Sequence, residues 1–519
     1  MEIIICLCSF IHSHFKQKQL YLLRKMNSSS VMAGNTSKAG SDLQQLPQQQ
    51  QLYVETYSVY VVTWNVGTRF PDNISLRSLL GLQGVDDPNT QDLPDIYAIG
   101  LQEVNVQPQQ QMLGLFKEDP WTHKIKKILR DYDYVVIKSE QMQGLLLSLF
   151  VRRVHVKHMR DIEPEFTRTG FGGMWGNKGA VSIRFSLYGC AITFVVAHLA
   201  AHDKHLDERI EDYEQIMENH HYHVPHYREI YDHDYVFWFG DLNFRLMGDD
   251  SPADVLAAIK NEKLSELIER DQLLHVRTKL QKAFHLMHER LPAFPPTFKF
   301  HEGTSNYDLK RRPAWTDRIL YALQPLNKRP DERLAIEQRS YKSFPAYNIS
   351  DHKPVSSEFS VKLYPNYRAP CVNFKEIAEW QIGEENTVEY VKPNDFEERN
   401  HDWIGVYRED FASLNEYIGY EYVNQAESPP SSPDSPVDPF FESPPQRSRR
   451  HHHRNHERLR RQQLQDEEDI RLDFSDDINM RDGERYLLIY FQNTGMRGVT
   501  SIAGMSNIFR AIVPRGNAN

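Results

Sequence analysis

Polar side chains follow the predicted strands of this chain at the points where those strands end. Between residues 53 and 363, short β-branched and aromatic runs alternate with helical stretches, which predicts one large mixed α/β domain. The residues that follow successive runs are Asn65, Gln102-Glu103, His198, Asp241 with Asn243, Asp317, and Asp351-His352. Carboxylates, amides and imidazoles in loops at strand ends are typical of a hydrolytic metal site. The fold must therefore bring together strand ends that lie far apart in the sequence.

The spacing of apolar and turn-forming residues predicts the elements of this domain. The expected strands are 57–64, 96–102, 134–137, 144–152, 180–185, 191–197, 235–239, 314–320 and 355–361. The Tyr188-Gly189 break predicts a hairpin over 182–197. Helices are expected at 120–130, 203–219 and 252–270, and the last begins with Ser251 as N-cap and Pro252 in the first turn.

Composition excludes several classes of protein. The chain has 519 residues and a formal net charge of −10, which argues against a nucleic-acid coat protein. Its 4 cysteines are too scattered for a disulfide framework or a four-thiolate zinc site, which favours a reducing compartment. The longest apolar run, residues 3–11, is shorter than the roughly 18 residues that span a bilayer. Its basic residues follow the run, whereas in a secretory signal they precede it.

Two shifts in composition divide the chain. Residues 27–52 are rich in Ser, Asn and Gln, and we expect residues 1–52 to form a disordered segment before a catalytic domain at 53–365. Strand-like texture continues over 371–513, which predicts a small β domain. A Pro-, Ser- and Arg-rich stretch at 424–484 interrupts it, and we expect this insertion to be disordered.

The polar residues at the strand ends suit the hydrolysis of a phosphate ester. That reaction needs a hard cation, a positioned water and donors to the nonbridging oxygens. A carboxylate from Glu103 and an amide from Asn65 favour Mg²⁺ over zinc. Asp317 and Asp351-His352 suggest that one acid orients the imidazole. Each residue alone is more often a cap, a turn residue or a structural histidine, so the hypothesis depends on the whole series.

The series resembles the motifs of the inositol polyphosphate 5-phosphatases. The matching segments are Thr63 to Gly67, Leu101 to Val104, Gly176 to Val181, His198 to His202, Gly240 to Arg245, Pro313 to Leu320 and Ser350 to Pro354. The resemblance implies a DNase I-like two-sheet α/β sandwich. It also implies Mg²⁺-dependent removal of the 5-phosphate from phosphoinositides, such as phosphatidylinositol 4,5-bisphosphate and phosphatidylinositol 3,4,5-trisphosphate, or from soluble inositol phosphates.

The resemblance also implies roles for individual residues. Glu103, with help from Asn65, would bind Mg²⁺, and Asp351 would lie near the metal. Asp241 and Asn243 would position or activate the attacking water, His198 and His352 would hold the scissile phosphate, and Asp317 would orient His352. The ring phosphates would be bound by basic residues, namely Lys178, Lys299, Lys310 and Arg312. Phe298 stands where many relatives carry a tyrosine, which puts the strength of 4-phosphate recognition in doubt.

The C-terminal part is similar to the SKICH domain, an immunoglobulin-like β-sandwich. The similarity covers His401 to Tyr407, Tyr417 to Val423, Gly483 to Phe491 and Ser506 to Phe509. A 5-phosphatase domain followed by this module is similar to the skeletal muscle and kidney enriched branch (SKIP) of the family, with the proline-rich branch as the alternative. The resemblance implies a cytoplasmic enzyme that is peripheral at the plasma membrane, with a pool at the endoplasmic reticulum. It also implies protein partners for the SKICH domain, and the Ser-Pro-rich loop is expected to bind partners as well.

Two other functions fit parts of the same pattern. A nuclease would have a similar metal site, but the nearly balanced charge of residues 51–365 does not favour a nucleic-acid partner. A non-catalytic adaptor would use only the second domain and the loop. The sequence leaves open the preferred substrate, the oligomeric state and the partner of the SKICH domain.

Overall fold

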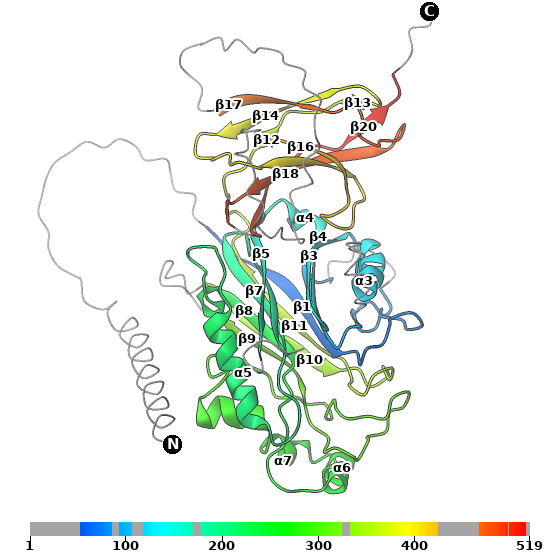
Figure 1. Cartoon of the computed structure of the whole chain (residues 1–519), viewed down its shortest axis with the longest axis vertical. Coiled ribbons are helices and arrows are strands. Elements are labelled where there is room, and N and C mark those ends of the chain that lie inside the picture. Colours follow the sequence, from blue (N-terminus) through cyan, green and yellow to red (C-terminus); the bar gives the residue numbers. More distant parts are fainter. Residues whose placement is uncertain are drawn as a thin grey trace, which may run out of the picture. The chain divides into compact units, whose positions relative to one another are not determined.

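A computed structural model describes residues 52–85, 93–105, 118–169, 178–323, 333–423, 467–496 and 498–514 (Figure 1). The first domain contains two sheets. One is six-stranded in the order β10-β11-β1-β2-β4-β3, and the other contains the run β5-β6-β7-β8-β9. Their strands are β1 (Glu55–Asn65), β2 (Ile96–Gln102), β3 (Tyr134–Met142), β4 (Leu145–Arg152), β5 (Met159–Arg168), β6 (Gly179–Leu187), β7 (Cys190–His198), β8 (Tyr235–Asp241), β9 (Asp317–Leu323), β10 (Ile336–Ser343) and β11 (Val355–Leu363).

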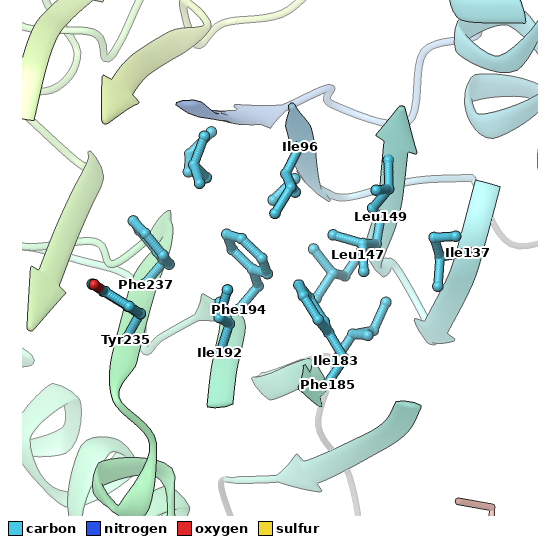
Figure 2. Packing of buried hydrophobic residues seen from close by; sticks show 14 of the residues in the cluster. Ile96, Ile137, Leu147, Leu149, Ile183, Phe185, Ile192, Phe194, Tyr235 and Phe237 are labelled. Carbon is cyan, nitrogen blue, oxygen red and sulfur yellow. The ribbon is translucent and has the colours of Figure 1, made fainter. Parts of the chain in front are cut away.

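The two sheets pack face to face, and alternation along each strand explains why. On β2, Ile96 and Ala98 belong to the central cluster, whereas Tyr97 and Ile99 belong to a second cluster on the outer face. On β7, Phe194 is likewise in the central cluster. Figure 2 shows the central layer, where Ile96 and Leu147 from one sheet face Phe194 and Phe237 from the other. The two-sheet α/β sandwich expected from the sequence is confirmed.

Helices cover the outer faces of the sandwich. Trp121, Ile125 and Leu129 of α3 (Pro120–Arg130) pack on the outer face of the first sheet. Ile210, Tyr213 and Ile216 of α5 (Leu206–Asn219) pack on the outer face of the second. The shorter helices are α4 (Arg153–Val156), η3 (Ile230–Asp232), α6 (Pro252–Lys260), α7 (Leu264–Ile268), α8 (Gln272–His275) and η4 (Val276–Leu280). None of the helices in the described ranges is both long and apolar enough to cross a bilayer.

Several predicted elements differ from the structure. The single helix expected over 252–270 is two helices, because Glu262 adopts a left-handed backbone (φ 58°) after α6. The strand expected at 314–320 begins at Asp317, since Ala314 instead bridges to Phe298. Strands β5 and β10 were not predicted. In β5 the charged residues and Pro164 obscure the strand pattern.

The second domain consists of two further groups of strands. Its strands are β12 (Asn373–Phe374), β13 (Glu379–Gln381), β14 (Asn386–Pro393), β15 (Trp403–Arg408), β16 (Tyr417–Tyr422), β17 (Glu467–Phe474), β18 (Arg485–Asn493), β19 (Thr500–Met505) and β20 (Phe509–Ile512). One group is β12-β14-β17, and the other joins β13, β20, β18, β19, β15 and β16. These strands enclose a separate core that includes Trp380, Tyr390, Tyr490 and Phe509.

The predicted bounds of the disordered insertion, 424–484, include residues that form a strand in the structure. Residues 467–474 form β17, which pairs antiparallel with β14 over its full length. Ile470 and Leu472 pack against the core of the second domain, while Asp469 and Arg471 are exposed. Because residues 467–474 are mostly acidic, their alternation of apolar and charged side chains was not recognised in the sequence. The predicted disorder of residues 1–51 and of 424–466 lies outside the described residues.

Candidate active site

The ends of four strands from both sheets form the candidate site. Parallel pairing aligns Asn65 at the end of β1 with Gln102 on β2, and it aligns His198 at the end of β7 with Asp241 on β8. The two sheets approach each other closely beside these strand ends, because β2 has a glycine, Gly100, two residues before Gln102. A Cβ atom at this position would lie only 2.4 Å from a ring carbon of Phe239. Side chains from the two sheets therefore meet at this edge.

The Asn65 amide links the two sheets at the centre of the site. Its Nδ2 donates to Glu103 Oε1 at 3.1 Å and to Asp241 Oδ2 at 3.0 Å. Glu103 has a left-handed backbone (φ 54°), a conformation that costs free energy for a residue other than glycine and that is concentrated at functional sites. The predicted metal-binding pair and the predicted water-positioning carboxylate are thus hydrogen-bonded through one amide.

Two histidines face the Asp241 carboxylate. His198 Nε2 lies 3.3 Å and His352 Nε2 lies 3.8 Å from Asp241 Oδ2. Burial alone would raise the pKa of Asp241, but the neighbouring His352 and His198 outweigh burial and lower it. Asp241 is therefore an ionised carboxylate at neutral pH. It can accept hydrogen bonds from water or from a protonated ring.

Asp317 lies on the far side of the His352 ring. Its Oδ2 accepts a hydrogen bond from His352 Nδ1 at 3.0 Å, and Thr297 Oγ1 donates to the same oxygen at 2.6 Å. Burial tends to lower the pKa of His352, but Asp317 and Asp241 reverse this and raise the pKa to about 9. The His352 ring is consequently a cation at neutral pH, fixed in orientation and suited to contact with a phosphate.

Asn243 is bonded entirely to protein groups. Its Nδ2 donates to the Leu199 carbonyl at 3.1 Å, its backbone N–H donates to Asp241 Oδ1 at 3.2 Å, and its Oδ1 accepts from Arg245 Nη2 at 2.5 Å. The residue also has a left-handed backbone (φ 58°). In this arrangement Asn243 holds the Asp241 carboxylate in place.

The four cations predicted to bind phosphates are placed differently. Lys178 contacts His198 Nε2, and burial lowers the pKa of both side chains. Lys299 Nζ lies 2.6 Å from Asp351 Oδ2. Lys310 has an exposed side chain.

Arg312 differs from the other three because its guanidinium has three protein acceptors. It donates to Asp203 Oδ2 at 3.2 Å, to the Leu246 carbonyl at 3.0 Å and to the Gly248 carbonyl. These contacts hold the Arg312 guanidinium against the loop that follows Asp241.

The donor set suits a hard divalent cation. Glu103 and Asp351 provide carboxylate oxygens. Ser350 Oγ lies between the residues near them, because it donates to the Asn65 carbonyl at 2.7 Å and lies 3.4 Å from Asp351 Oδ1. A second acidic grouping, Asp241 with Asp317 and His352, has ligand atoms within 4.8 Å of one another. In this second grouping the imidazole is already hydrogen-bonded to Asp317. Glu103, Asn65 and Asp351 remain the predicted cation ligands.

Sequence reasoning missed one residue of this site. Arg245 is buried, with 4% exposure, and its guanidinium carbon lies 4.4 Å from the centre of the Phe298 ring. The same ring lies 4.5 Å from the ring of His352. Arg245 ends the segment Gly240 to Arg245 that drew attention to Asp241, but an arginine after a strand is usually a surface residue.

Comparisons with known proteins agree with this geometry. The model of the endonuclease/exonuclease/phosphatase family 2 matches residues 62–358, and the SKICH domain model matches residues 372–451. Human phosphatidylinositol 4,5-bisphosphate 5-phosphatase A is 38% identical over 378 residues, which cover 71% of this chain and 37% of that protein. The chain thus spans little more than a third of that relative.

For two further relatives, the match with this chain covers a larger share of the relative's own length. Inositol polyphosphate 5-phosphatase K from Mus musculus is 36% identical over 381 residues, covering 70% of this chain and 79% of that protein. The solved inositol polyphosphate 5-phosphatase domain of SPsynaptojanin, in complex with inositol (1,4)-bisphosphate and calcium ion, has 31% sequence identity and a TM-score of 0.50. It covers 60% of this chain and 86% of that one. The chain therefore belongs to the inositol polyphosphate 5-phosphatase family and carries a SKICH domain after its catalytic sandwich.

Proposed function

We propose that the chain hydrolyses the 5-phosphate of phosphoinositides and of soluble inositol phosphates with Mg²⁺ as cofactor. The observation that carries this proposal is the Asp241 carboxylate, which lies between two histidines and the Asn65 amide at the meeting point of both sheets. The names of the relatives support phosphatidylinositol 4,5-bisphosphate as a substrate. Phosphatidylinositol 3,4,5-trisphosphate is a further candidate substrate.

The residues of this chain divide the work of the reaction. Asp241 accepts a hydrogen bond from the attacking water. This bond orients the water so that a lone pair of the water oxygen points at phosphorus. The His352 cation donates to a nonbridging oxygen, and Lys178 and Lys299 add positive charge around the phosphates. Mg²⁺ held by Glu103, Asn65 and Asp351 would neutralise the charge that develops on the phosphoryl oxygens. Positioning contributes more than deprotonation, because phosphoryl transfer has a loose transition state.

Phosphate release from a panel of phosphoinositides and soluble inositol phosphates tests this proposal. We expect cleavage of 5-phosphorylated substrates only, loss of activity with a chelator, and a loss of about a hundredfold or more in Asp241→Asn. Glu266→Gln, which changes an exposed acid on α7, is the matched control and should retain activity. Release of phosphate from other ring positions, or none from folded wild-type protein, would refute the assignment.

We further propose that the enzyme is cytoplasmic and peripheral at the plasma membrane and endoplasmic reticulum, with the SKICH domain as the recruiting module. The similarity of residues 372–451 to SKICH domains supports this. The Ser-Pro-rich loop is proposed as a second contact for protein partners. Imaging of the fluorescent full chain tests recruitment, with a Trp380→Ala variant, which removes a buried side chain from the separate core of the second domain, as comparison. Identical distribution of the two proteins would count against the proposal.

A further inference from the structure

A cluster of cations lies where the linker between the two domains meets the catalytic sandwich. The linker, residues 364–371, packs on the turn between β6 and β7, because a Cβ atom at Gly189 of that turn would lie only 2.8 Å from the ring of Tyr367. In the same turn, the ring centre of Tyr188 is 4.6 Å from that of His158, just before β5. The turn therefore brings together the linker and the start of β5, which lie far apart in the sequence.

Each of these two segments has an arginine that is held by backbone carbonyls. Arg160 Nη1 donates to the carbonyls of Lys157 and Met159, at 2.9 and 3.0 Å. Arg368 Nη1 donates to the Pro365 carbonyl at 2.9 Å and to the carbonyl of the preceding residue at 3.2 Å. The Nε and Nη2 donors of both arginines have no hydrogen-bond partner in the described part of the chain. One edge of each guanidinium is thus anchored, and its other edge can bind a ligand.

Positive charge at this junction is not balanced by an ion pair. Lys157 and Arg368 are exposed and Arg160 is half-buried, and none of the three forms an ion pair with a described carboxylate. Asp161 favours the charge of Arg160, but burial is the larger influence and lowers its pKa. Burial and the three cations together lower the pKa of His158 to about 4. Like charges held close together repel, so an anion bound among them would be stabilised.

The junction lies at the opposite end of β7 from the candidate active site. Strand β7 begins at Cys190, next to the turn, and ends at His198. At about 3.3 Å per residue, this strand spans about 26 Å. A ligand at the turn is therefore too far away to contact Asp241, and the cation cluster is a site of its own.

We propose that Arg160, Arg368 and Lys157 bind a phosphate monoester at the junction between the catalytic sandwich and the linker. The paired Nε and Nη2 donors of arginine match two oxygens of a phosphate, whereas lysine adds a point charge. A phosphate monoester carries about two negative charges at neutral pH, which suits two guanidinium groups better than a single carboxylate does. Soluble inositol phosphates and phosphoinositide headgroups share this chemistry. The site goes beyond the proposed function, because it takes no part in hydrolysis.

Hydrogen exchange of the full chain in metal-free buffer tests the proposal. The probes are inositol 1,4-bisphosphate and phosphatidylcholine vesicles that contain phosphatidylinositol 4-phosphate, neither of which has a 5-phosphate to be cleaved. We expect slower amide exchange over 157–160 and 364–371 in wild type, and no such change in Arg160→Gln/Arg368→Gln. Protection by the soluble probe assigns the site to free inositol phosphates, and protection by the vesicles alone assigns it to the lipid headgroup. Equal protection by phosphatidylserine vesicles of the same charge would overturn the proposal, because it would show binding without a phosphate monoester.

Further variants separate a phosphate site from a loss of folding. Arg160→Lys/Arg368→Lys keeps the charges but not the paired donors, so the probe concentration that gives half of the protection should rise by about tenfold. Arg339→Gln, on an exposed arginine of β10, is the matched control and should be protected as wild type is. The glutamine double variant should hydrolyse soluble inositol 1,4,5-trisphosphate within about twofold of the wild-type rate, because the cluster is remote from Asp241.

Two results would show that these cations are only solvated surface charges. One is the absence of protection at the junction in folded wild type with either probe. The other is protection of the glutamine double variant at the same probe concentrations as wild type. Neither result depends on turnover, so failure of the proposed function would be seen separately, as the absence of phosphate release from 5-phosphorylated substrates.

Discussion

At the scale of single residues, the site works by fixing charges that would be unstable if they were left unpaired. The buried Asp317 carboxylate accepts hydrogen bonds from Thr297 and His352, and the His352 ring in turn faces Asp241. Each charge therefore has a partner before any substrate arrives. Preorganisation of this kind is worth more in a buried site than at the surface, because the protein does not have to reorganise during the reaction.

Replacing Asp317 with asparagine tests this chain of charges. The amide keeps the shape of the side chain but removes the negative charge that holds the His352 cation in place. We expect kcat to fall by about ten- to a hundredfold with little change in KM, as for other residues that orient a site group through a hydrogen bond. Initial rates on inositol 1,4,5-trisphosphate measure both constants. Thr297→Val, which removes one hydrogen bond to Asp317 but leaves its negative charge, should cost much less, and an equal loss in the two variants would contradict this interpretation.

At the scale of elements, the sequence carries most of the information for strands that cross the sandwich core. The strand expected at 96–102 and the helix expected at 120–130 have those bounds in the structure. Their apolar periodicity is strong because both faces of β2 and one face of α3 are buried. Strands β17 and β5 were harder to predict from the sequence. Both carry charged residues on exposed faces, and this composition resembles that of a loop.

The candidate site was predictable to the extent that its residues end buried strands. Asn65, His198 and Asp241 each follow a run of buried residues, so their position in the chain indicated the site. The hydrogen bond between Asn243 and Arg245 depends on a left-handed turn, and the contact between Phe298 and Arg245 joins segments about fifty residues apart. Neither has a local sequence pattern, which is why Arg245 was missed.

The turn that leads into β15 carries a buried carboxyl whose ionisation opposes folding. Asp402 accepts hydrogen bonds from Tyr490 Oη at 2.9 Å and from the Asn493 backbone N–H at 2.7 Å. Burial nevertheless raises its pKa to about 6, whereas an unfolded aspartate titrates near about 3.9. The folded form thus holds its proton more tightly than the unfolded form.

The sign of the pH dependence follows from this difference. The stabilising contribution of Asp402 is complete below about pH 4 and is lost as the pH rises through about 6, a change on the order of 2–3 kcal/mol. Asp402→Asn cannot ionise, so the free energy of unfolding of wild type minus that of the variant should fall over this range. Urea denaturation of both proteins between pH 4.5 and 7.5 measures the difference. A pH-independent difference would show that the carboxyl is ionised throughout.

At the scale of the whole molecule, strands of the SKICH domain continue the hydrogen bonding of the catalytic sheets. Thr500 on β19 pairs with Ile162 on β5, which lies at the edge of the β5-β6-β7-β8-β9 run. Val136, on the edge strand β3 of the six-stranded sheet, donates to the Ala412 carbonyl at 2.8 Å. Edge strands expose unpaired backbone groups, so these contacts satisfy part of both edges from within the same chain.

The apolar residues at this boundary belong to the central cluster of the catalytic sandwich. Phe411 is buried, and the Arg153 guanidinium carbon lies 4.5 Å from the centre of its ring. A separate domain on a flexible tether would have an interface more polar than this one. The two domains should therefore unfold in one cooperative transition, and a cavity at the boundary should destabilise both.

Phe411→Ala tests this coupling, because it removes a large buried ring from the second domain while leaving the catalytic residues unchanged. A truncation of this kind costs about 3–5 kcal/mol, and we expect the whole transition to move to lower temperature in differential scanning calorimetry. Hydrogen exchange should quicken in β3 and β5 as well as in β15, whereas Ile508→Ala, at an exposed position, should change neither measurement. Two resolved transitions, with only the SKICH transition shifted by Phe411→Ala, would instead show that the catalytic sandwich is stable without its neighbour. The SKICH domain would then be a separable recruiting module, and the strand pairing between β5 and β19 would contribute little to the stability of the catalytic sandwich.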